Sequence, residues 1–113
     1  MDIERKLDLV VDACEDKNGI DIKVLKIGHL TTIAEYFVIV SGNSSNQVMS
    51  IADAVEEKVL KEEDMDFVKE GYRSGRWILL DFNDIIVHVF HKEEREFYDL
   101  ERLWSEAEEI SIN

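Results

Sequence analysis

The sequence predicts an α/β fold in which a single mixed sheet of about five strands is flanked by helices. Three features support this class: an amphipathic segment at the N-terminus, a continuous apolar run at 36–40, and two β-rich runs joined by a two-residue turn at 83–84. A chain of 113 residues suits one domain, 1–113, with one hydrophobic core.

The first part of the chain alternates between helical and strand patterns. Residues 2–17 place apolar side chains at helical spacing, and the Asn-Gly pair at 18–19 is a typical helix stop. Residues 20–27 alternate between apolar and charged side chains, which predicts a strand exposed on one side. Residues 36–40 are all apolar and predict a central strand that is buried on both faces.

Two further helices and one short strand are expected in the remainder. The second helix begins at a cap formed by Ser44 or Ser45 and runs to about residue 61. Residues 65–69 predict a short strand, and residues 92–108 predict a last helix. The apolar positions of that last helix are Phe97, Leu100, Leu103, Trp104 and Ala107.

A tight antiparallel hairpin is the clearest local prediction. The β-rich runs 76–82 and 85–90 flank the turn Asn83-Asp84. The register that follows pairs Phe82 with Ile85, Asp81 with Ile86, Leu79 with His88 and Trp77 with Phe90. Because side chains alternate along a strand, one face of the hairpin is entirely apolar. That face, predicted to join the core, carries Ile78, Leu80, Phe82, Ile85, Val87 and Val89.

The opposite face of the hairpin is the candidate binding site. Its residues, predicted to contact a partner, are Trp77, Leu79, Asp81, Ile86, His88 and Phe90. This face is too apolar for an ordinary solvated surface, and its aspartate and histidine make it a poor second core. Either helices cover it, or it remains open as a patch where Trp77 is an anchor and Asp81 meets a basic side chain. A further alternative is that the patch forms a homodimer.

The charge of the chain restricts its partners. Its 26 acidic and 13 basic residues give a net charge of −13. Binding to nucleic acid requires basic residues that neutralise phosphates, so we expect little direct nucleic-acid contact. The charge favours a basic protein partner, although it also serves solubility. The sequence contains no run of about twenty apolar residues, so no membrane-spanning segment is predicted. The single cysteine, Cys14, lies on an apolar helical stripe, which fits a core residue and a reducing, cytoplasmic compartment.

The turn 41–45 is the main candidate for catalysis. This turn lies between a strand and a helix, where backbone N–H groups could bind an anion. It lacks the P-loop ending and the three-glycine fingerprint of dinucleotide-binding proteins. A nucleotidyltransferase needs two carboxylates on one strand face to hold two metal ions. The nearest pair, Asp81 and Asp84, straddles the hairpin turn and does not share a face. Asp84 is more simply a turn residue.

The histidines give weaker indications. Asp81 and His88 are diagonal neighbours on one hairpin face, which suggests a hydrogen-bonded carboxylate and imidazole more simply than an acid–base dyad. His29 and His91 have no partners at metal-ligand spacing. We therefore predict no metal site and no cofactor.

Several separated segments agree in order and spacing with one known family. They are Tyr36–Gly42, Ser44-Ser45, Val48–Asp53, Glu70-Gly71, Trp77–Asp81, Asp84, Val87–Phe90 and Phe97–Trp104. Together they resemble the Iojap family of ribosomal silencing factors (RsfS), and the resemblance extends from the first helix to Trp104. One position departs from the family: Asn46 stands where a basic residue is common.

The resemblance implies a cytoplasmic factor that binds the large ribosomal subunit through large-subunit ribosomal protein fourteen. Such a factor blocks joining of the small subunit and represses translation when nutrients are scarce. The family fold is similar to that of nucleotidyltransferases without their active site, which implies that the chain is not an enzyme. The alternative function is a nucleotidyltransferase-like enzyme that uses the Ser41–Ser45 turn.

Overall fold

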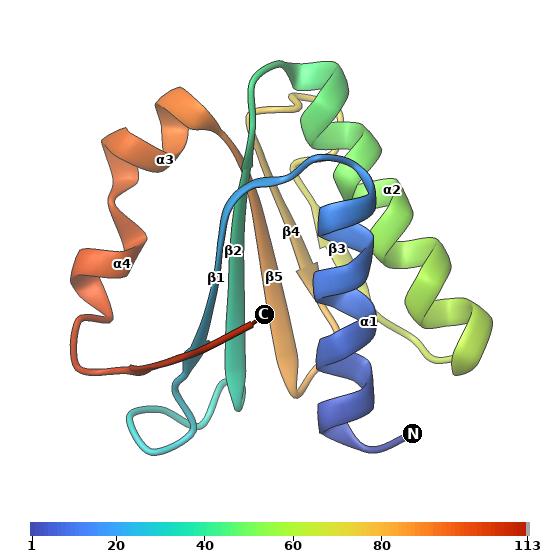
Figure 1. Cartoon of the computed structure of the whole chain (residues 1–113), viewed down its shortest axis with the longest axis vertical. Helices are drawn as coiled ribbons and strands as arrows, with labels where there is room; N and C mark the ends of the chain where they lie inside the picture. The colour runs from blue at the N-terminus through green and yellow to red at the C-terminus, as the bar shows by residue number, and fades with distance from the viewer. Residues whose placement is uncertain (113) are drawn as a thin grey trace.

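The computed structural model describes residues 1–112 and contains one mixed sheet with helices on both of its faces (Figure 1). The strands are β1 (Ile20–Lys26), β2 (Tyr36–Gly42), β3 (Val68–Glu70), β4 (Trp77–Asp81), β5 (Ile85–His91) and β6 (Glu108–Ile110). The helices are α1 (Ile3–Asp16), α2 (Ser45–Glu62), α3 (Lys92–Tyr98) and α4 (Leu100–Leu103). The strand order across the described part of the chain is β3-β4-β5-β2-β1-β6. The predicted α/β class is confirmed, with one strand more than expected.

The two long helices cover one face of the sheet (Figure 1). The Asp2 side chain caps α1 by accepting a hydrogen bond from the Arg5 N–H at 2.8 Å. The Ser44 hydroxyl caps α2 by accepting a hydrogen bond from the Gln47 N–H at 3.1 Å, so one of the two predicted caps is confirmed. These caps satisfy N–H groups that would have no partner within the helix.

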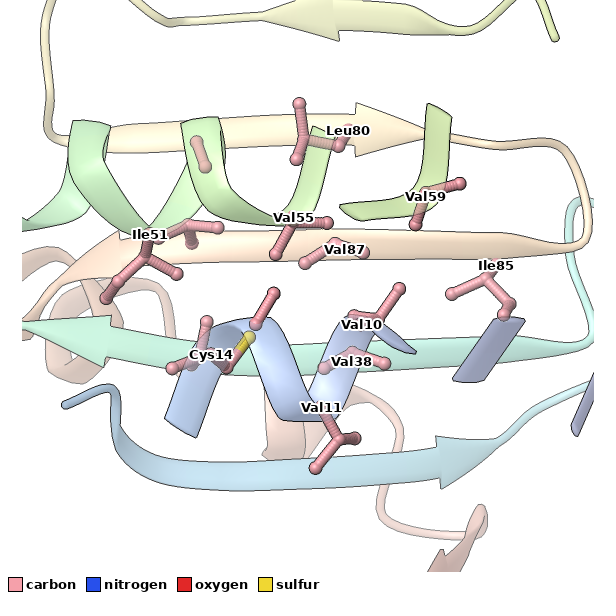
Figure 2. Packing of buried hydrophobic residues seen from close by; sticks show 14 of the residues in the cluster. Val10, Val11, Cys14, Val38, Ile51, Val55, Val59, Leu80, Ile85 and Val87 are labelled. Carbon is pink, nitrogen blue, oxygen red and sulfur yellow. The ribbon is translucent and has the colours of Figure 1, made fainter. Parts of the chain in front are cut away.

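The main core lies between these helices and the sheet. Figure 2 shows Val10, Cys14 and Val55 from the helices packed over Leu80 and Val87 from the strands. The whole predicted core face of the hairpin is buried here: Ile78, Leu80, Phe82, Ile85, Val87 and Val89. Full burial of one such side chain stabilises the fold by about 1.5–3 kcal/mol relative to exposure. Burial also raises the pKa of the Cys14 thiol to about 12, which suits the predicted core residue.

The centre of the sheet agrees with the sequence pattern. β2 pairs in parallel with β5, and residues 37–40 of β2 are buried between the helical layers, as predicted, whereas Tyr36 is half-buried. β4 and β5 form the predicted antiparallel hairpin. The observed pairs include Trp77 with Phe90, Leu79 with His88 and Asp81 with Ile86. The hairpin register, and with it the division of side chains between two faces, is therefore confirmed.

The turn residue Asp84 has a second role that the sequence did not reveal. Its carboxylate lies 3.0 and 3.2 Å from the Nζ of Lys6, whose side chain is only 5% exposed. Its backbone carbonyl accepts hydrogen bonds from the N–H groups of Glu35 and Tyr36, at 2.8 and 3.1 Å. The hairpin turn is thus tied to α1 by a partly buried ion pair and to the start of β2 by backbone hydrogen bonds.

The predicted last helix is wrong in its extent. Instead of one helix over 92–108, the structure has the short helices α3 and α4, followed by β6, which pairs with β1. The break occurs at Asp99, whose φ of 48° and ψ of 53° lie in the left-handed region. Phe97 and Leu103, two of the apolar positions of the predicted helix, are 79% and 75% exposed. Leu100, Trp104 and Ala107 do pack against the sheet, as expected.

The short strand before the hairpin is displaced from its predicted position. β3 occupies Val68–Glu70 rather than 65–69 and pairs with β4 at the exposed edge of the sheet. None of the described helices has the length and apolar character needed to cross a membrane.

Candidate functional site

The structure divides the six predicted site residues into two groups. Ile86, His88 and Phe90, all on β5, are buried, whereas Trp77, Leu79 and Asp81 on β4 are half-buried. α3 and α4 lie over this face of the sheet, opposite to α1 and α2 (Figure 1). They complete a second, smaller apolar cluster of Leu25, Ile27, Ala34, Phe37, Ile39, Ile86 and Phe90. Both sequence-based alternatives therefore hold in part: β5 is covered, and β4 remains partly open.

Trp77 lies at the boundary between the covered and open parts. Its indole stacks on Phe90 with ring centroids 4.8 Å apart and contacts the Tyr98 ring at 4.7 Å. Beside it, Glu70, Gly71, Trp77 and Leu79 line an open hollow of about 300 Å³. A half-buried tryptophan next to a hollow is typical of an anchor residue at a protein interface.

Gly71 shapes the wall of this hollow. Its φ is +78°, and a Cβ placed there would lie 2.1 Å from the Trp77 carbonyl oxygen. Any side chain would therefore clash with the backbone of β4, in addition to the strain of a positive φ. The loop at Gly71 can approach the Trp77 backbone this closely only because the residue is glycine.

A buried arginine attaches the covering helices to the sheet. From α3, the Arg95 guanidinium donates to the Ser41 hydroxyl at 2.9 Å and to the Ile20 carbonyl at 3.2 Å. It also binds the Glu101 carboxylate, at 3.0 and 3.2 Å, across the break at Asp99. Charge-assisted bonds of this kind are stronger than neutral ones, so Arg95 holds α3 and α4, and with them Tyr98, in place.

The predicted hydrogen bond between Asp81 and His88 is wrong. The Asp81 carboxylate accepts from the Asn83 N–H at 2.8 Å, and the Trp77 indole N–H donates to His88 Nδ1 at 3.2 Å. Burial lowers the pKa of His88 to about 4, so the imidazole is neutral at pH 7. A neutral ring bonded to an indole is a poor acid–base dyad.

Sequence analysis missed the part of the surface contributed by α3 and α4. Tyr98 contacts Trp77, and the exposed Phe97 packs edge-on against Tyr98 at 5.1 Å. Helical spacing identified Phe97 only as one of the apolar positions of the predicted last helix. No glycine or proline marks the break at Asp99, so the sequence carries no strong signal of it. The surface formed by Trp77 and Leu79, here called the Trp77 surface, is extended outwards by Phe97 and Tyr98.

The Ser41–Ser45 turn, the candidate for anion binding, is closed by its own side chains. The Asn43 N–H donates to the Gln47 side-chain oxygen at 2.7 Å, and the Gln47 N–H donates to Ser44. The Ser41 hydroxyl already accepts the bond from Arg95. The backbone donors that a phosphate would need are thus engaged at Asn43 and Gln47.

Among residues 1–112, one group of side chains has metal-ligating atoms close together. Ligand atoms of His91, Glu93 and Glu94 lie within 4.8 Å of one another. However, the Arg76 guanidinium pairs with both carboxylates and lowers the pKa of Glu93. His91 Nδ1 accepts a hydrogen bond from the Glu93 N–H at 3.2 Å and so caps α3. These atoms already have partners that explain their positions.

Comparisons with known proteins identify the family. The family model described as "Ribosomal silencing factor during starvation" matches residues 1–113. A ribosomal silencing factor RsfS from Halalkalibacterium halodurans is 39% identical over 113 residues, covering 99% of this chain and 96% of the relative. A crystal structure of a Chromobacterium violaceum protein superposes with a TM-score of 0.87 at 39% identity, covering 93% of this chain and 88% of that one.

A more distant relative extends the comparison to an organelle. The mouse protein named "Mitochondrial assembly of ribosomal large subunit protein 1" is 31% identical over 102 residues, which are 88% of this chain and 45% of the mouse protein. The resemblance found in the sequence is thus confirmed, and the family is one of regulatory factors rather than enzymes. The chain belongs to the ribosomal silencing factor family.

Proposed function

We propose that this chain, acting as a single domain in the cytoplasm, binds the large ribosomal subunit and sterically blocks its association with the small subunit. Translation would then be repressed, most strongly when nutrients are limiting. The family description, which refers to starvation, and the large subunit in the name of the mouse relative support this proposal.

The observation that carries the proposal is the half-buried Trp77 beside an open hollow. Trp77, Leu79 and Asp81 make the direct contacts with large-subunit ribosomal protein fourteen. The indole provides the apolar anchor, and Asp81 meets a basic side chain of the partner. The buried residues of the predicted site, Ile86, His88 and Phe90, support the surface from beneath.

Charge favours a protein contact over an RNA contact. The net charge of −13 opposes the approach of a phosphate backbone, and it attracts a basic protein surface. Glu70 carries this charge into the lining of the hollow, and Asp81 lies two residues along β4 from Leu79. We therefore propose little direct contact with ribosomal RNA.

Sedimentation with purified ribosomal components tests the function. The protein should sediment with large subunits, should not sediment with small subunits, and should reduce the fraction of joined ribosomes when both are mixed. Protein-free ribosomal RNA should not bind detectably. Tight binding to that RNA, or normal joining of subunits saturated with the protein, would contradict the proposal.

The same surface also suggests self-association of the free protein. Phe97, which packs against Tyr98 beside Trp77, is 79% exposed, and exposed apolar patches often mediate association. A homodimer formed here would compete with the ribosome. The alternative enzyme function makes a different prediction: nucleotide with magnesium would raise the melting temperature of an enzyme but not that of a ribosome-binding factor.

A further inference from the structure

His88 is a polar residue in an apolar environment. Its side chain lies on β5 beneath the candidate surface and is 5% exposed. The Phe37 ring packs edge-on against the imidazole at 4.7 Å, and the Phe90 ring lies stacked at 6.1 Å. Burial disfavours the charged form of the ring, as the lowered pKa indicates.

Only one nitrogen of this imidazole has a hydrogen-bond partner among the described residues. Nδ1 accepts from the Trp77 indole N–H at 3.2 Å, and Nε2 is buried without a partner. Because Nδ1 is an acceptor, the proton of the neutral ring is on Nε2. A buried N–H without an acceptor costs stability, and an apolar side chain in the same place would avoid that cost. The stability of the core therefore does not explain a histidine at this position.

The bond to Trp77 does explain it. The indole is held on its other sides by aromatic contacts with Phe90 and Tyr98, which tolerate sliding and tilting of the rings. A hydrogen bond is directional and adds the missing constraint on how the indole lies. Trp77 and His88 are on neighbouring strands, offset by two residues from direct pairing, so the sheet fixes the geometry of the acceptor.

We propose that His88 is a positioning residue that holds the Trp77 indole in the orientation used for docking. The inference rests on the proposed function, since it assumes that Trp77 contacts the partner. An ordered anchor binds more tightly because less side-chain freedom is lost on association. His88 itself does not touch the partner, and its contribution is made through Trp77.

Two nearly isosteric substitutions separate this role from a packing role. His88→Asn keeps an acceptor close to the position of Nδ1, whereas His88→Leu has a similar shape and no acceptor. Asparagine should retain the bond to the Trp77 indole and leucine should lose it. His88→Leu is expected to leave the melting temperature of the isolated protein nearly unchanged, because removal of the unsatisfied Nε2–H offsets the loss of the acceptor for the Trp77 indole N–H.

The indole N–H of Trp77 can be observed directly by NMR. The chain has two tryptophans, so a ¹⁵N-labelled sample gives two indole signals, and Trp77→Phe identifies the one from Trp77. Solvent exchange of that proton should be slow in the parent protein and in His88→Asn. It should become at least about fivefold faster in His88→Leu, as expected for the loss of one hydrogen bond. The Trp104 signal is the internal control and should not change.

Affinity for purified large subunits completes the test. His88→Leu should weaken binding by about five- to tenfold and His88→Asn by less than about twofold. Trp77→Ala should bind large subunits more weakly than either histidine variant. Unchanged exchange of the Trp77 indole in His88→Leu would overturn the positioning role. A faster exchange combined with unchanged affinity in both His88→Leu and Trp77→Ala would instead contradict docking through Trp77. Parallel losses of affinity in the leucine and asparagine variants would show that packing, rather than the acceptor, matters.

Discussion

Truncation of Trp77 should detach the protein from the large subunit while leaving the fold intact. Loss of a tryptophan anchor from an interface costs about 2–4 kcal/mol of binding free energy, which is roughly a thirty- to thousand-fold loss of affinity. The indole is only half-buried, and the main core lies on the opposite face of the hairpin. We therefore expect Trp77→Ala to lower the free energy of unfolding by only about 1–2 kcal/mol, less than a fully buried tryptophan would.

The assay combines urea unfolding of the free protein with sedimentation against large subunits and a subunit-joining measurement. Leu80→Ala is the matched control on the same strand, because Leu80 is fully buried on the opposite face. It should cost about 2–5 kcal/mol of stability through a core cavity, while the folded fraction still binds. If Trp77→Ala unfolds the protein and Leu80→Ala does not, the assignment of the two faces is wrong. If folded Trp77→Ala binds normally, the proposed surface is wrong.

Three further predictions follow from individual contacts. Asp84→Asn should lower the free energy of unfolding by about 2–4 kcal/mol in urea titrations, because Lys6 loses its counter-ion, and a loss below about 1 kcal/mol would contradict this. The unfolded His88 binds a proton near pH 6.5 and the folded one only near pH 4, so stability falls as the pH falls through that range. Between pH 7 and pH 5, the free energy of unfolding of the parent protein should fall by about 2 kcal/mol more than that of His88→Leu. Equal falls in the two proteins would show that protonation of His88 is not the cause. Phe97→Ser should weaken self-association in analytical ultracentrifugation without changing the melting temperature, since Phe97 is 79% exposed, and a lower melting temperature would place Phe97 in the core.

Sequence reasoning succeeded where periodicity and turn chemistry agree. The Asn83-Asp84 turn set the hairpin register, and the register alone separated the Leu80 face from the Trp77 face. The all-apolar run at 36–40 identified the central strand, since a strand with apolar side chains on both faces must be buried on both faces. The turn and the apolar run are both set by residues that are adjacent in the sequence, which is why the sequence pattern reveals them.

The failures depend on tertiary contacts. The helix break at Asp99 is stabilised by Arg95, which binds Glu101 on one side and the strand ends at Ile20 and Ser41 on the other. Helical spacing cannot reveal such bonds, so the sequence pattern continued the helix through the break. β6 was missed because a three-residue strand has almost no pattern of its own and exists by pairing with β1. The ion pair of Lys6 with Asp84 joins residues 78 apart in the chain.

The candidate site was predicted in part for the same reasons. Local pattern placed all six residues on one face, but which of them remain open depends on where α3 and α4 lie. The aromatic extension at Phe97 and Tyr98 comes from the element that was predicted least well. This surface combines β4 with α3, so it could be predicted only if the positions of both elements were known.

Site-specific photo-cross-linking is the most direct test of the central claim. A photoreactive amino acid in place of Leu79, which lines the hollow beside Trp77, would be activated on purified large subunits carrying the bound protein. We expect one dominant cross-link, to large-subunit ribosomal protein fourteen, which is lost when Trp77→Ala is added. A dominant cross-link to ribosomal RNA or to another ribosomal protein would contradict it.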